Sequence, residues 1–209
     1  MLTNSVNQVP PTSKSKSFLH HYFNKHSLEL SQSFKITQIS DDEKRACISA
    51  FYLPDYASRL ESVPPREPGT CEWVTEHRNV RAWSESQSSE LLWLSGNPGC
   101  GKTVISSFLI ESLRTHSEIT TIYFICDNKL EHFRSKENIL RFILHQLMTH
   151  DPSLVHHAIG YYRNMQASVA KSSSAMWAIF VNMLKGQYPS KPVFFVLDAL
   201  DECDIETRE

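Results

Sequence analysis

The distribution of apolar and polar positions divides the chain into strand-like and helix-like segments. Three short strand-like runs, at residues 91–94, 119–126 and 193–197, have the length and the β-branched and aromatic content of strands. A run without polar positions is typical of a strand that is covered on both faces, and this expectation is clearest for 91–94. The pattern therefore predicts three strands.

The segments around these runs carry apolar residues at the spacing of one helix face. Such segments lie at 73–83, 105–113, 139–147, 154–162 and 177–184. Strands that alternate with helices predict an α/β fold in which helices flank a parallel sheet.

The N-terminal third reads differently from the rest. Residues 1–40 are polar and lysine-rich around one small apolar cluster, and they predict a loose, partly disordered arm. A helical segment begins at Asp41, and a proline-rich linker ends near residue 69. We expect domain boundaries at 1–40 for the arm, 41–69 for the helical linker and 70–209 for the compact α/β part.

Composition and charge limit the class of protein. The 209 residues are 41% hydrophobic and 21% charged, and 21 basic against 23 acidic residues give a formal net charge of −2. These values favour a soluble globular protein and give no support to nucleic-acid binding. No apolar run approaches the about 20 residues of a membrane span, and the N-terminus lacks the apolar block of a secretory signal. We therefore expect a protein of the cytoplasm.

The five cysteines and ten histidines show no metal-binding or disulfide pattern. The cysteines are odd in number and scattered, and no Cys-x-x-Cys pair occurs. We expect neither a disulfide framework nor a zinc site, and a reducing compartment fits this usage best.

A glycine-rich segment after the first strand is the strongest chemical signal. It matches the phosphate-binding pattern G-x-x-x-x-G-K-[ST] over Gly96, Asn97, Pro98, Gly99, Cys100, Gly101, Lys102 and Thr103. The glycines let successive N–H groups face the nucleotide phosphates, and the following helix adds its positive end. Lys102 would reach the β and γ phosphates, and the Thr103 hydroxyl would bind Mg²⁺. The alternative, a chance glycine-rich turn, is disfavoured by the strand before the segment and the helix after it.

The third strand ends in acidic residues. Asp198 stands at the carboxyl end of a predicted parallel strand, where ligands bind in such sheets, and could hold Mg²⁺ through water. Asp201 and Glu202 follow and could polarise an attacking water. Without the upstream loop, an ordinary strand with a solvated acidic turn would explain these residues equally well.

The phosphate loop and the segment 193–202 together resemble a known family. GNPGCGKT and VFFVLDALDE look like the NACHT-type members of the STAND class of P-loop NTPases, with Ala199, Asp201 and Glu202 at matching positions. The segments around Trp73, Trp83 and residues 91–94 are similar to the nephrocystin 3-like N-terminal region of fungal NLR-like proteins. The resemblance covers about residues 42–207. It implies an ATP/ADP and Mg²⁺ switch in signal transduction, with homo-oligomers or full-length NLR-like relatives as partners.

The sequence departs from the resembled family at its C-terminal end. Family members continue with another strand, which inserts between the loop strand and the Asp198 strand, and with a lid and repeats, whereas this sequence stops at Glu209. We therefore expect a sheet without a central strand and weak or absent ATP hydrolysis.

Three functions are compatible with the sequence. The first is a nucleotide-dependent switch, and the second is a nonenzymatic truncated fragment that associates with full-length relatives. The third, a small-molecule kinase, has less support because no arginine cluster follows the acidic strand. ATP is preferred over GTP, because Asn128 and Lys129 precede the Asp198 strand, the wrong order for a guanine-reading motif.

Overall fold

The computed structural model describes residues 5–8, 39–54, 56–127, 129–185 and 191–203, and these fall into two units. The loop unit comprises the described residues of 1–38 and 68–102. The sheet unit comprises the described residues of 39–67 and 103–209. Each unit is considered by itself.

The loop unit contains a two-stranded antiparallel sheet and two short helices. Strand β1 (Ser5–Gln8) pairs with β2 (Leu92–Ser95). Helices α4 (Glu72–Glu76) and α5 (Arg78–Ser84) replace the single periodic segment expected at 73–83. They are separate because His77 is extended, with φ −65° and ψ 130°, and its ring nitrogen accepts the N–H of Asn79 at the start of α5.

The burial expected for the first strand was wrong. Leu91 and Trp93 are 56% and 51% exposed, and the burial of β2 alternates along the strand. The pairing explains the difference, because an antiparallel pair of strands can leave one face in water, whereas the expectation assumed a parallel sheet with helices on both sides.

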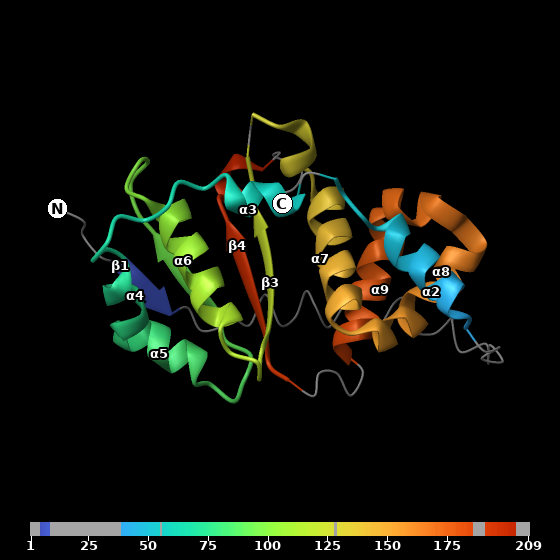
Figure 1. Ribbon diagram of the computed structural model, residues 1–209, viewed down its shortest axis with the longest axis horizontal. Coiled ribbons are helices and arrows are strands. Elements are labelled where there is room, and N and C mark those ends of the chain that lie inside the picture. Colours follow the sequence, from blue (N-terminus) through green and yellow to red (C-terminus); the bar gives the residue numbers. More distant parts are fainter. Residues whose placement is uncertain (1–4, 9–38, 55, 128, 186–190, 204–209) are drawn as a thin grey trace. The chain divides into compact units, whose positions relative to one another are not determined.

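The sheet unit contains the parallel pair that the sequence predicted. Strands β3 (Thr120–Ile125) and β4 (Val193–Asp198) run side by side in the same direction (Figure 1), in a register that places Thr120 opposite Val193 and Ile125 opposite Asp198. This confirms an α/β fold with a parallel sheet flanked by helices. Within the described ranges β4 pairs with β3 alone.

Helices surround this parallel pair. The α-helices of the sheet unit are α2 (Asp41–Ala50), α3 (Tyr56–Glu61), α6 (Lys102–Arg114, from Thr103 on), α7 (Lys136–His150), α8 (Val155–Met165) and α9 (Ser173–Lys185). Short 3-10 turns lie at η1 (Glu131–Phe133), η2 (Pro152–Leu154), η3 (Gln166–Lys171) and η4 (Leu200–Glu202). Helices α2, α7, α8 and α9 form a cluster beside β3 (Figure 1).

Helix α7 protects the outer edge of β3. The side chain of Gln146, on α7, accepts the backbone N–H of Tyr123 at 3.3 Å and donates to the carbonyl of the same residue at 2.8 Å. A free strand edge is a template for unwanted pairing, and an unpaired buried backbone group is costly. Gln146 therefore takes the place of a neighbouring strand at this position.

An aromatic cluster packs α3 against β3 and α7. Tyr56, 1% exposed, stacks on Phe142 with ring centroids 3.8 Å apart and contacts Phe124 and Phe133 at 4.7 and 4.5 Å. Its hydroxyl is buried and has no hydrogen-bond partner among the described residues, and burial raises the pKa of this phenol. The ring, and not the hydroxyl, stabilises this contact.

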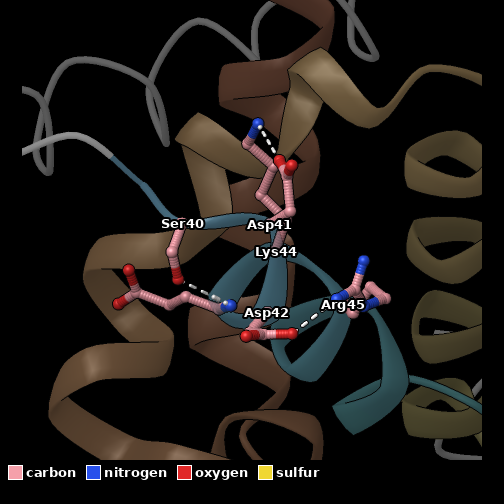
Figure 2. Close-up of polar contacts among 6 residues, drawn as sticks. Ser40, Asp41, Asp42, Lys44 and Arg45 are labelled. Carbon is pink, nitrogen blue, oxygen red and sulfur yellow. Dashed lines mark hydrogen bonds and ion pairs between the residues drawn. The ribbon is translucent and has the colours of Figure 1, made fainter.

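Helix α2 begins at a clear capping signal. The Ser40 side chain accepts the backbone N–H of Glu43 at 3.2 Å, and Asp41 and Asp42 bind Lys44 and Arg45 one turn further on (Figure 2). The hydrogen bond from Lys44 lowers the pKa of Asp41. These contacts explain why the helical segment begins where the sequence predicted.

A bidentate ion pair joins α2 to α8. Arg163 donates to the two carboxylate oxygens of Glu43 at 2.6 and 2.9 Å, and this hydrogen bonding lowers the pKa of Glu43. The two residues lie 120 positions apart in the sequence. The first helix after the arm is thereby tied to the helical cluster.

Much of the expected polar arm lies outside the described residues. The apolar cluster of Phe18, Leu19, Tyr22 and Phe23 is among the residues that the structure does not describe. Residues 5–8 of the arm form β1. The domain boundaries expected from the sequence remain a prediction.

Candidate functional site

The predicted phosphate loop connects β2 to α6, as its mechanism requires. The loop glycines take conformations that other residues rarely adopt: Gly99 has φ 75° and Gly101 has φ 84°, both in the left-handed region. A Cβ atom at Gly96 would lie 2.8 Å from the sulfur of Cys100, so the chain folds back closely on itself there. Gly99 and Gly101 are therefore glycines for their backbone conformation, whereas at Gly96 a side chain would meet the sulfur of Cys100.

Lys102 folds back over this loop. Its ammonium group donates to the carbonyl of Gly96 at 3.0 Å and to that of Asn97 at 3.2 Å, while the N–H of Cys100 donates to the Asn97 carbonyl at 3.3 Å. The cation thus lies at the loop that would bind phosphate. Pro98 lies in the same turn, between Asn97 and Gly99.

The two predicted metal-binding residues both belong to the sheet unit. Thr103 is half-buried in the first turn of α6. Asp198 ends β4 and is 6% exposed. Its Oδ1 atom accepts a hydrogen bond from the Ser106 hydroxyl at 3.0 Å, whereas its Oδ2 atom is buried and has no hydrogen-bond partner among the described residues.

A buried carboxylate oxygen without a donor is costly unless a ligand satisfies it. Carboxylate and hydroxyl oxygens are also the ligands that Mg²⁺ prefers. Asp198 and Thr103 therefore fit a magnesium ion in their chemistry. The part of the chain that the structure describes holds no cluster of three or more His, Cys, Asp or Glu suited to a metal. A nucleotide-bound Mg²⁺ needs only one or two carboxylates, because phosphates and water supply the rest.

The predicted catalytic acids lie on a turn after β4. Asp201 and Glu202 are exposed in η4, and the N–H of Glu202 donates to the Ala199 carbonyl at 2.8 Å. Ala199 has φ 56° and ψ 38°, so the chain leaves the strand through a left-handed residue that is not glycine. This strained residue turns the acidic segment away from the strand direction.

Sequence reasoning missed three contacts at or near strands β3 and β4. It did not single out Ser106 or Gln146, and it did not pair Cys126 with Cys203. The structure joins those two cysteines in a disulfide, with Cα atoms 6.1 Å apart, so the expectation of no disulfide was wrong for this pair. The cysteines lie 77 positions apart in the sequence, and only the parallel pairing of β3 with β4 brings them together. The one available signal was that Cys126 ends one predicted strand and Cys203 follows another closely.

The described residues contain no helix that is long and apolar enough to span a membrane.

Comparison with known proteins identifies the family. The family described as "Nephrocystin 3, N-terminal" matches residues 69–209. The chain is also 25% identical over 136 residues to the vegetative incompatibility protein HET-E-1 of Podospora anserina, a match that covers 63% of this chain and 10% of the relative. The chain thus spans about a tenth of the length of this curated relative. No solved structure gives a significant match.

The family match confirms the resemblance drawn from the residues. It begins at Gly69, includes the phosphate loop and extends past Asp198, so the segments that carry the candidate chemistry all lie inside it. It leaves the arm and α2 outside. From the helices before the loop to the acidic turn after β4, this chain belongs to the nephrocystin 3 N-terminal family.

Proposed function

We propose that this chain is the nucleotide-binding module of a STAND/NACHT signalling NTPase, a cytoplasmic switch that binds ATP or ADP with Mg²⁺. The observation that carries the proposal is the conformation of the loop from Gly96 to Gly101. Two of its glycines have positive φ, and the Lys102 ammonium group lies on the loop carbonyls. Loops of this kind bind phosphates through backbone N–H groups at a helix start.

Lys102 would supply the mobile positive charge. In the structure the ammonium group donates to two neutral carbonyls, which are weaker partners than phosphate oxygens. A nucleotide phosphate would therefore compete well for this cation. The same exchange would release the carbonyls of Gly96 and Asn97.

Asp198 and Thr103 would hold the metal. The unsatisfied Oδ2 atom of Asp198 supports this role, because a water of a hydrated Mg²⁺ could donate to it. When bound, the ion would offset the negative charge of the β and γ phosphates. Asp201 and Glu202 would polarise an attacking water, but they are exposed on a single turn, so we expect slow hydrolysis.

Titration calorimetry with ATP, in Mg²⁺ and separately in EDTA, tests the proposal. Lys102→Ala should weaken binding at least about 100-fold in both buffers, because the loop loses a charge-assisted partner of the phosphates. Asp198→Asn should weaken binding only in Mg²⁺, because the carboxylate acts through the ion.

The control is Lys171→Ala, which removes an exposed lysine from η3 of the sheet unit. It should bind as the unmodified chain does. Equal affinity of Lys102→Ala and the control would refute the loop as a phosphate site. An Asp198→Asn defect of the same size in EDTA would assign this residue to folding.

A second candidate function is association with a partner, either another copy or a full-length NLR-like relative. It is favoured by β4, whose residues are mostly only half-buried and which pairs with β3 alone within the described ranges. Sedimentation with and without ATP and Mg²⁺ separates the two functions. Self-association that is unchanged by Lys102→Ala would favour a nonenzymatic role.

A further inference from the structure

The hydrogen bond between Ser106 and Asp198 joins two residues that lie 92 positions apart. Ser106 is 7% exposed and Asp198 is 6% exposed, so the contact is largely buried. Both residues belong to the sheet unit. A contact of this kind fixes the rotation of the carboxylate, because Oδ1 is held by a donor on a rigid helix.

The contact leaves the carboxylate only half satisfied. One hydroxyl group meets Oδ1, and Oδ2 has no hydrogen-bond partner within the described part of the chain. A buried carboxylate normally accepts several hydrogen bonds or pairs with a cation, since its desolvation is expensive. A serine hydroxyl is also neutral, so it orients the carboxylate without cancelling the charge that attracts a cation.

The helix places Ser106 beside the other predicted metal residue. Thr103 and Ser106 are three positions apart in α6, and residues at this spacing are neighbours on one side of a helix. One turn of α6 thus carries both the hydroxyl expected on the metal and the hydroxyl that holds Asp198.

We propose that Ser106 is a positioning residue for the metal: it holds Oδ1 of Asp198 so that Oδ2 is presented to the hydrated Mg²⁺ of the bound nucleotide. The inference rests on the proposed function and adds a residue outside the phosphate-loop pattern. Residues that orient a metal ligand typically change metal affinity by about 10–100-fold when they are removed.

The test measures the Mg²⁺ concentration that gives half-maximal binding of a fluorescent ATP analogue to the full chain. Ser106→Ala should raise this concentration about 10-fold and leave the affinity in EDTA unchanged, because only the metal-dependent step uses Asp198. Ser106→Thr, which keeps the hydroxyl, should stay within about 3-fold of the unmodified chain.

Ser107→Ala is the matched control. Ser107 is the next residue of α6 and is half-buried, so Ser107→Ala also removes one serine hydroxyl from this helix. It should leave the Mg²⁺ midpoint unchanged. If Ser106→Ala does not fold, Ser106→Cys replaces the hydroxyl with a weaker donor of similar size and should give a smaller rise of the same kind.

The outcomes separate this inference from the proposed function. Lys102-dependent binding with an unchanged Mg²⁺ midpoint in Ser106→Ala, or in Ser106→Cys, would overturn the role of Ser106 and leave the proposed function intact. A lower melting temperature in Ser106→Ala with no midpoint change would show that the contact only stabilises the fold. If the unmodified chain does not bind the analogue at all, both proposals are wrong.

Discussion

Strands β3 and β4 have the same length and pair in register, yet their surroundings differ. All six residues of β3 are buried. Most of β4 is half-buried, and Leu197 is 41% exposed. Strand β3 has β4 on one edge and Gln146 on the other, whereas β4 has a strand partner only in β3 within the described ranges.

The difference does not follow the hydropathy of the strands. The sequence TTIYFI of β3 begins with two threonines, and VFFVLD of β4 is more apolar over its first five positions. Burial here depends on what covers a strand. The apolar, half-buried side chains of β4 therefore form a surface that another segment or protein could cover, and covering it would stabilise the fold.

The largest expected effect compares one side chain from each strand. Phe124 on β3 is 0% exposed and contacts Tyr56 and Phe142, so Phe124→Ala should lower the free energy of unfolding by about 3–5 kcal/mol. Leu197→Ala on β4 should lower it by less than about 1 kcal/mol, because much of this side chain already meets water. Urea unfolding measures both. Similar losses would show that β4 is as well covered as β3.

The edge contact of β3 gives the next largest effect. Gln146→Ala removes both hydrogen bonds to the backbone of Tyr123 and should lower the free energy of unfolding by about 2–3 kcal/mol, since two buried groups lose their partners. Hydrogen exchange at the Tyr123 amide should become faster. The control Gln87→Ala removes an exposed glutamine and should change stability by less than about 0.5 kcal/mol. An unchanged exchange rate would mean that α7 does not protect this edge.

A change in the aromatic cluster that packs on β3 should increase stability. Tyr56→Phe removes a buried hydroxyl that has no partner among the described residues and keeps the ring contacts, so the free energy of unfolding should rise by about 1 kcal/mol. Thermal melts of this variant and of Tyr52→Phe measure the effect. Tyr52 is 54% exposed, so its variant should melt as the unmodified chain does. A destabilised Tyr56→Phe would reveal a partner for the hydroxyl.

The smallest expected effect is the acid response of the ion pair between α2 and α8. The pKa of Glu43 is lowered in the folded chain, mainly by its hydrogen bond to Arg163. The pair therefore stabilises the fold above the carboxyl's ordinary pKa, and this contribution is lost as the pH falls through the lower, folded-state value. Glu43→Gln should reduce stability slightly at neutral pH and flatten its acid dependence. Thermal melts from pH 7 to pH 3 measure this, with the exposed Glu111→Gln as control. If the two variants have the same melting temperatures at every pH, the ion pair does not contribute to the stability of the fold.

Local signals in the sequence predicted the elements well. The apolar runs located β3 and β4, and the glycine pattern located the turn between β2 and α6. Both signals come from residues that are close in the sequence, where backbone conformation and side-chain period decide the outcome. The exposure of Trp93 was not predicted, because a short apolar run does not reveal which strand pairs with it.

Contacts between distant residues could not be predicted in the same way. Ser106 is an ordinary polar residue in an amphipathic helix until β4 places Asp198 beside it. Gln146 likewise has no local sign that it meets the backbone of Tyr123. Such contacts depend on which faces of the elements meet, and one sequence alone does not specify that.

The disulfide between Cys126 and Cys203 closes the main chain into a covalent ring that contains α7, α8 and α9. A protease that cuts the ring once opens it without releasing a piece, because the bridge still holds the two ends. Limited digestion within residues 129–185 should therefore leave an intact mass on a denaturing gel without reductant and two fragments with it. The same ring limits how far α7, α8 and α9 can be pulled from the strands, even after every noncovalent contact between them has broken.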